Sequence, residues 1–145
     1  MIETFYRDLE EGKKVEEIVL TEIVQPKYPD AHIVDGYCKE WDIFIPSKHK
    51  GIEVKYDPMS QKTGNIVVEV AFNGKLSALM TTKSYRWIFY TGTSFIITTP
   101  YRILKTIANN KLYPVEFTGN GDRHSKLAYL IKQTMLEDTA LKVQS

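Results

Sequence analysis

Residues 41–57 read Trp-Asp-Ile-Phe-Ile-Pro-Ser-Lys-His-Lys-Gly-Ile-Glu-Val-Lys-Tyr-Asp. The two ends of this stretch, 41–45 and 52–57, are rich in the apolar and β-branched residues that favour β-strands. The polar segment 46–51 begins with proline and ends with glycine, which is typical of a tight connection. The stretch therefore predicts an antiparallel hairpin, and the rest of the fold is interpreted around it.

Charged side chains in this hairpin follow the period of a strand. Glu53, Lys55 and Asp57 are two residues apart, so they are expected on one face, and antiparallel pairing can bring Asp42 beside Glu53. A solvated sheet face explains this pattern, since antiparallel strands often bury one side and expose the other. A metal site explains it as well, and the spacing alone leaves both interpretations open.

The metal interpretation has a definite chemistry. Mg²⁺ prefers hard oxygen ligands, often one or two carboxylates together with waters and substrate phosphate. Asp42 and Glu53 can supply the carboxylates, and the main-chain oxygen of Val54 is a candidate third ligand. Lys55, aimed at the same place, could hold an attacking water and stabilise charge that develops on phosphorus.

The remaining pattern predicts one α/β domain over residues 1–145. Apolar residues at helical spacing predict an N-terminal helix that ends before Pro26. Threonine followed by proline at 99–100 is a helix start signal. Together the elements predict a mixed five-stranded sheet flanked by an N-terminal helix and C-terminal helices. Strands are expected at 41–45, 52–57, 65–72, 85–91 and 94–98, helices at 2–24, 100–108 and 125–136, and loops at 58–64 and 109–123.

Composition excludes several classes of protein. The net charge of +1 does not point to nucleic acid as a strongly basic domain would. The single cysteine, Cys38, excludes disulfide frameworks and clustered zinc motifs, and its expected role is a small packed side chain rather than a nucleophile. No stretch resembles a signal peptide or a membrane span, so we expect a cytoplasmic protein without a membrane partner.

Asp42, followed after ten intervening residues by Glu53-Val54-Lys55, resembles the core motif of the PD-(D/E)XK nuclease superfamily. This superfamily includes restriction endonucleases and Holliday-junction resolvases. Tryptophan at position 41 departs from the proline of the motif's name. The wider layout, over about residues 5 to 85, is similar to small phage-type members, at Phe5, Asp8, Leu9, Gly12, Glu16, Trp41, Ile43, Tyr56, Asp57, Thr63, Gly64, Asn65 and Glu69.

The resemblance implies a restriction-endonuclease-like core and a Mg²⁺-dependent DNA endonuclease, with Mn²⁺ as a substitute ion. Asp42, Glu53, Lys55 and Glu16 would be the catalytic residues. The chain would act on DNA as a homodimer, with the structure specificity of the junction resolvases as one expectation, and a phage origin would fit. Three alternatives stay open: a sequence-specific homing or restriction-like endonuclease, a catalytically silent nucleic-acid-binding module on this fold, and an unrelated α/β interaction protein.

Glu16 shares the apolar side of its predicted helix with Val19, Leu20 and Ile23. An unpaired carboxylate is expensive to bury, so this side chain must reach solvent, pair with a lysine or serve a site. The resemblance favours the site.

Two further acids and several cations are weaker candidates. Asp57 could support the site, although aspartate before proline is a common turn former. Glu69 could hold a second metal ion or orient Lys55, or it could simply point outward from a half-solvated strand. Candidate DNA contacts are Gln61, Lys62, Lys75, Lys83 and Arg86.

Overall fold

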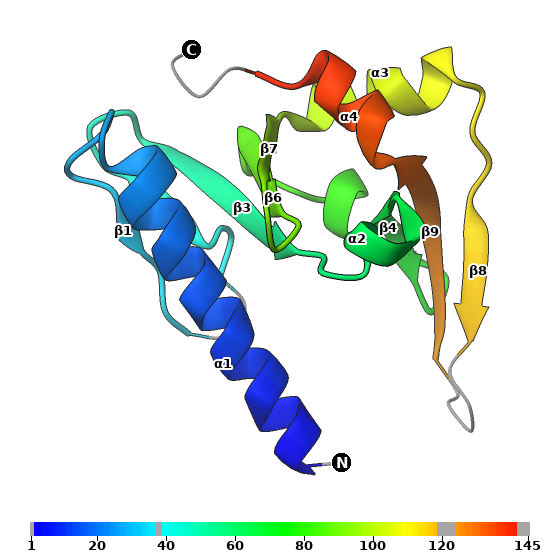
Figure 1. Cartoon of the computed structure of the whole chain (residues 1–145), viewed down its shortest axis with the longest axis horizontal. Helices are drawn as coiled ribbons and strands as arrows, with labels where there is room; N and C mark the ends of the chain where they lie inside the picture. Colours follow the sequence, from blue (N-terminus) through cyan, green and yellow to red (C-terminus); the bar gives the residue numbers. More distant parts are fainter. Residues whose placement is uncertain (1, 37–38, 119–123, 142–145) are drawn as a thin grey trace.

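The computed structural model describes residues 2–36, 39–118 and 124–141 of the chain (Figure 1). Cys38 and the Gly-Asn-Gly segment 119–121 lie outside the described residues, so the predictions made for them stay untested. The predicted class is confirmed, because the structure is a mixed α/β fold with a five-stranded mixed sheet and helices near both ends.

The N-terminal helix follows the predicted bounds. α1 spans Ile2–Val19 and continues as one wide π-helical turn, η1, over Leu20–Val24. Val15 and Val19 are buried against the first sheet, which explains the helical spacing of apolar residues in the sequence.

The five-stranded sheet has the order β1-β2-β3-β6-β7. Its strands are β1 (His32–Ile33), β2 (Ile43–Ile45), β3 (Lys50–Tyr56), β6 (Arg86–Tyr90) and β7 (Phe95–Thr98). β2 and β3 form the predicted antiparallel hairpin, whereas β3 and β6 run parallel, so the sheet is mixed. The short β1 was not predicted, and two residues are too few to give a periodic signal.

A second sheet corrects three sequence predictions. The strand expected at 65–72 lies here, rather than in the first sheet, and residues 125–132 of the expected C-terminal helix form a strand. Part of the expected loop 109–123 is also a strand. The sheet is antiparallel, in the order β5 (Lys75–Leu76), β4 (Asn65–Phe72), β9 (Ser125–Lys132) and β8 (Val115–Thr118).

The error at β9 has a clear cause. Leu127, Leu130 and Ile131 fit a helical stripe, but Leu127, Tyr129 and Ile131 fit strand alternation equally well. In the structure the latter three pack against the core, because β9 pairs along almost its whole length with β4. Long-range pairing thus overrides an ambiguous local pattern.

Four short helical segments complete the fold. The predicted start of α3 is confirmed, since the Thr99 hydroxyl oxygen accepts a hydrogen bond of 3.1 Å from the backbone N–H of Arg102. The expected loop 58–64 contains one helical turn. The segments are α2 (Ser60–Thr63), the 3₁₀ turn η2 (Ala78–Met80), α3 (Pro100–Asn109) and α4 (Gln133–Thr139).

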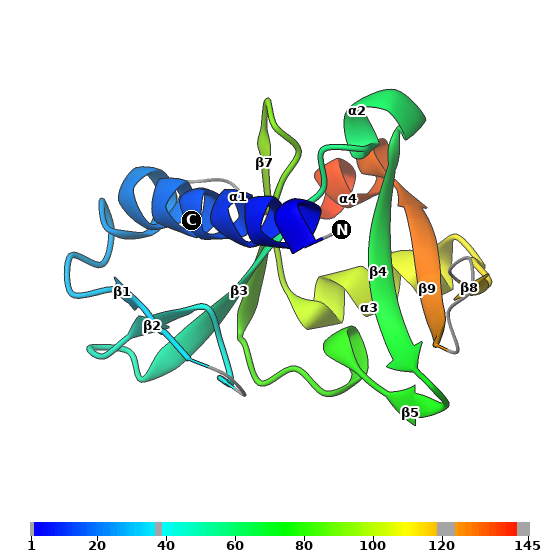
Figure 2. The same cartoon turned by 90° about the horizontal axis from the view of Figure 1, so that it is seen from below.

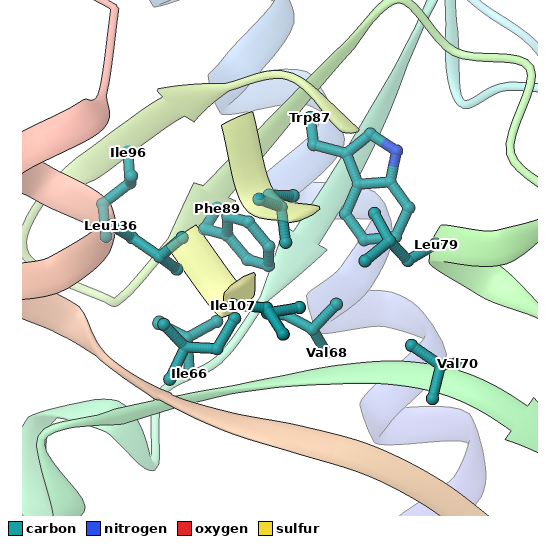
Figure 3. Packing of buried hydrophobic residues seen from close by; sticks show 11 residues of the cluster. Ile66, Val68, Val70, Leu79, Trp87, Phe89, Ile96, Ile107 and Leu136 are labelled. Atoms are coloured by element: carbon teal, nitrogen blue, oxygen red, sulfur yellow. The ribbon is translucent and has the colours of Figure 1, made fainter. Parts of the chain in front are cut away.

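Alternate residues of β6 pack into two different hydrophobic cores. Ile88 packs in the core beneath α1, whereas Trp87 and Phe89 point to the opposite side, toward the second sheet, α3 and α4. Figure 3 shows Phe89 among Ile66, Ile96, Ile107 and Leu136, with Trp87 beside Leu79. In Figure 2, α1 and β3 lie at the left of the view, and β4 and β9 lie at the right.

No helix within the described residues is both long enough and apolar enough to span a bilayer.

Candidate functional site

The hairpin register places Asp42 next to the Glu-Val-Lys segment, as predicted. Ile43 pairs with Ile52, and the backbone N–H of Asp42 donates to the Ile52 carbonyl at 3.0 Å. The Asp42 carboxylate then accepts a hydrogen bond of 2.8 Å from the backbone N–H of Val54. The aspartate is therefore fixed at the end of β2, beside the middle of β3.

Trp41, at the position that departs from the motif, has a packing role. Its ring stacks on Phe44 with 5.2 Å between ring centroids, and it lies directly over Gly51. A side chain at position 51 would collide with the indole, so the hairpin needs glycine there.

Glu53 and Lys55 lie on the face of β3 that does not contact α1. Their partners on β6 are Trp87 and Phe89. The Lys55 ammonium lies 3.2 Å from the Glu53 carboxylate and 5.6 Å from the centre of a Trp87 ring. These two contacts hold the Lys55 ammonium close to the Glu53 carboxylate.

Sequence reasoning missed Lys39, which links Glu16 to this group. Its ammonium lies 3.5 Å from the Glu16 carboxylate and 3.2 Å from the Asp42 carboxylate. It also donates a hydrogen bond of 3.1 Å to the Val34 carbonyl oxygen. A lysine three residues before a candidate ligand was the available signal, but only the tertiary structure shows that this is the lysine that Glu16 reaches.

The electrostatics of the site reflect crowded carboxylates. Burial raises the pKa of Glu53 above its ordinary value, and the Asp42 carboxylate raises it further, while Lys55 and Lys39 oppose the shift. Burial also raises the pKa of Glu16, again with a contribution from Asp42. Burial alone would lower the pKa of Lys39, but Asp42 and Glu16 raise it above its ordinary value. The charge of Asp42 thus contributes to the raised pKa of both Glu53 and Glu16.

These shifts predict the stability of a Glu53→Gln variant. A carboxyl group whose pKa is raised by folding stabilises the fold fully below its unfolded pKa, near 4.5, and this contribution is lost as the pH rises through the folded pKa. Glutamine stays neutral, so the metal-free variant should resist urea better than the wild type at pH 7, and the difference should shrink toward pH 4. Glu10→Gln, at an exposed position of α1, is the control and should change little. A less stable Glu53→Gln protein at pH 7 would contradict the prediction.

Two neighbouring cavities open on either side of Trp87 and Ala78. One, of about 290 Å³, is lined by Glu53 and by Lys39, Glu40, Thr81, Thr82 and Lys83. The other, of about 440 Å³, is lined by Lys55 and by side chains of the second sheet, including Val67, Glu69 and Lys126. Glu53 and Lys55, which are two residues apart on β3, therefore face different cavities, and lysines line both.

Carboxylate oxygens are gathered here, but they are not arranged around one point. In residues 2–36, 39–118 and 124–141, no group of three or more His, Cys, Asp or Glu side chains is placed to hold a metal ion. Instead the ammonium of Lys39 lies between Glu16 and Asp42. A cation in this place shows that the two carboxylates can share a positive charge, and carboxylates are ligands that suit Mg²⁺. Carboxylates are the ligand type that the sequence resemblance implies, and their arrangement around a metal ion stays a prediction.

No family model, curated protein or solved structure matches this chain.

Asp57 and Glu69 lie away from the acid group. One oxygen of Asp57 accepts a hydrogen bond of 3.1 Å from the backbone N–H of Val67, so this side chain joins the end of β3 to β4. The Glu69 carboxylate accepts a hydrogen bond of 2.7 Å from the Ser77 hydroxyl and lies 3.9 Å from the ammonium of Lys126. Glu69 shares a cavity with Lys55, which keeps its supporting role open as a prediction.

The candidate DNA contacts are dispersed. Lys83 lines the cavity beside Glu53 and pairs with Glu40 at 3.3 Å. Arg86 pairs in register with Ile52, on the side of the sheet that faces α1, so it is not grouped with Glu53.

The other three candidates lie in peripheral elements. The Gln61 side chain donates a hydrogen bond of 2.6 Å to the Thr91 carbonyl, which gives it a structural role. Lys62 is exposed on α2, and Lys75 is exposed on β5 at the edge of the second sheet.

Proposed function

We propose that this chain is a Mg²⁺-dependent DNA endonuclease with a restriction-endonuclease-like core. The observation that supports it best is the juxtaposition of Asp42 with the Glu53-Val54-Lys55 segment, through the 2.8 Å hydrogen bond from Val54 to Asp42. Glu16, from a helix distant in sequence, is joined to the same group through Lys39.

Each residue has a distinct task in this proposal. Asp42, Glu53 and the main-chain oxygen of Val54 would hold Mg²⁺, which when bound supplies Lewis acidity toward the phosphate. Glu16 would accept a hydrogen bond from the attacking water and so orient it. The Lys55 ammonium would stabilise negative charge on the phosphate oxygens in the transition state.

The two cavities would accommodate the DNA strand on either side of the Glu-Val-Lys segment. Lys39 and Lys83 line one cavity, and Lys55 and Lys126 line the other. Phosphate contacts of this kind give affinity without sequence information, so binding should weaken steeply with salt. Recognition of DNA structure rather than sequence, and action as a homodimer, are the finer proposals that the sequence resemblance suggests.

A cleavage panel tests the function. Purified protein is incubated with Mg²⁺ or with EDTA and with linear, nicked, single-stranded and four-way-junction DNA. Cleavage that requires Mg²⁺ supports the nuclease, and preference for the junction supports the structure-specific form. Cuts at one site in linear duplex would favour a sequence-specific enzyme. Salt-sensitive DNA binding without any cleavage would contradict the nuclease and indicate a silent binding module.

Lys55→Met is expected to lower the cleavage rate by about 100-fold, because it removes a charge that stabilises the transition state. Mn²⁺ binding should persist, since the carboxylates remain. Lys50→Met is the matched control: it removes the same charge from the same strand, at an exposed position where the ammonium lies over Tyr85. Equal activity of the two variants would remove Lys55 from the proposed mechanism.

A further inference from the structure

The position of Lys39 points to a role that the nuclease proposal does not include. Its ammonium makes three polar contacts, with Glu16, Asp42 and the Val34 carbonyl, at 3.5, 3.2 and 3.1 Å. The side chain is about one-quarter exposed, and the carboxylates of Glu16 and Asp42 are more buried, with 16% and 13% of their side chains exposed. An ammonium has three N–H donors, so these contacts match its hydrogen-bonding capacity.

A metal ion and this ammonium would compete for the same carboxylate oxygen of Asp42. Asp42 already gives one oxygen to the backbone N–H of Val54, and its other oxygen is the one that contacts Lys39. A divalent ion bound at Asp42 would therefore need the oxygen that Lys39 occupies. Two cations cannot share that oxygen at short range without strong repulsion.

We propose that Lys39 is a built-in counter-ion, which partly offsets the negative charge of Glu16 and Asp42 in the metal-free protein and must be displaced when a divalent ion binds. This inference rests on the proposed metal site. It explains why oxygen ligands are gathered around Asp42 while the carboxylates do not yet surround one point.

The lysine has opposite effects on the two states of the protein. In the metal-free state it compensates for the repulsion between partly buried carboxylates, so its removal lowers stability. In the metal-bound state that compensation comes from the ion, and Lys39 only opposes binding. A residue that merely supports the shape of the site would instead strengthen binding by its presence.

Mn²⁺ titration by calorimetry, with wild type, Lys39→Met and Lys39→Arg, distinguishes these cases. Methionine keeps the aliphatic stem without the charge, and we expect it to bind Mn²⁺ about tenfold more tightly, equivalent to about 1.4 kcal/mol. Arginine keeps the charge and should stay near the wild-type affinity. Lys50→Met, which removes the same charge at an exposed position, is the control and should also match the wild type.

Thermal unfolding gives a second measurement on the same proteins. In EDTA, Lys39→Met should melt below the wild type, and saturating Mn²⁺ should raise its melting temperature by the larger increment. If Lys39→Met does not fold, Lys39→Gln takes its place, because glutamine keeps a hydrogen-bond donor without the charge.

The outcomes separate this inference from the nuclease proposal. Unchanged or weaker Mn²⁺ binding by the Lys39 variant, with binding still abolished by Asp42→Asn, would overturn the counter-ion role and leave the metal site intact. Absence of Mn²⁺ binding in wild type and variants alike would overturn both.

Discussion

Asp42→Asn should fold like the wild type, and its Mg²⁺-dependent cleavage rate should be at least about 100-fold lower. The reason is that the substitution removes the negative charge of a proposed metal ligand. Asparagine suits this test because its amide oxygen can still accept the hydrogen bond that Val54 donates to Asp42. The change therefore removes the negative charge and preserves the link between the hairpin strands.

The control for this variant is Asp138→Asn, which makes the same substitution at an exposed position of α4. Circular dichroism and urea unfolding establish that both proteins are folded before their cleavage rates are compared. Cleavage at the wild-type rate by a folded Asp42→Asn protein would contradict the metal-binding role of Asp42, and with it the proposed metal site.

The second large effect concerns stability. Phe89→Ala should lower the free energy of unfolding by about 3–5 kcal/mol, the cost of deleting a buried aromatic ring and leaving a cavity. Only 1% of Phe89 is exposed, and the residue lies in the core that joins the first sheet to the second sheet and the C-terminal helices (Figure 3). A domain typically has about 5–15 kcal/mol of stability, so this variant should lose a large fraction of it.

Phe117→Ala is the matched control, since this phenylalanine lies on β8 with 38% of its surface exposed. It should cost less than about 1 kcal/mol, in line with other exposed positions. Urea unfolding of both variants measures the difference. Similar losses at the two positions would mean that Phe89 does not unite the two halves of the fold in the way the structure indicates.

The relative positions of the candidate residues in the hairpin could be predicted because their geometry is local. A short antiparallel connection fixes the register of its two strands, and strand alternation then decides which side chains share a face. The pairing of Ile43 with Ile52 follows from this, and it places Asp42 beside Glu53 and Val54. Local capping chemistry made the start of α3 at Pro100 predictable in the same way.

Positions that depend on distant parts of the chain could not be predicted. From the sequence, Glu16 was expected to pair with a lysine, to reach solvent or to serve a site. In the structure it pairs with Lys39, which also contacts Asp42. The chain has many lysines, and nothing local distinguishes the one that folding brings to Glu16. Asp57 likewise follows the strand alternation of Glu53, yet its carboxylate binds the backbone of β4.

By itself, the sequence determined the hairpin, the N-terminal helix and the α/β class, because these depend on periodicity and turn chemistry over a few residues. Only the tertiary structure decided that 65–72 and 125–132 pair with each other in a second sheet, and that Lys39 lies between two acids. The physical reason is the same in both cases. Hydrogen-bond pairing and charge compensation between distant segments are decided by which surfaces fold together, and that choice leaves no periodic signal in either segment.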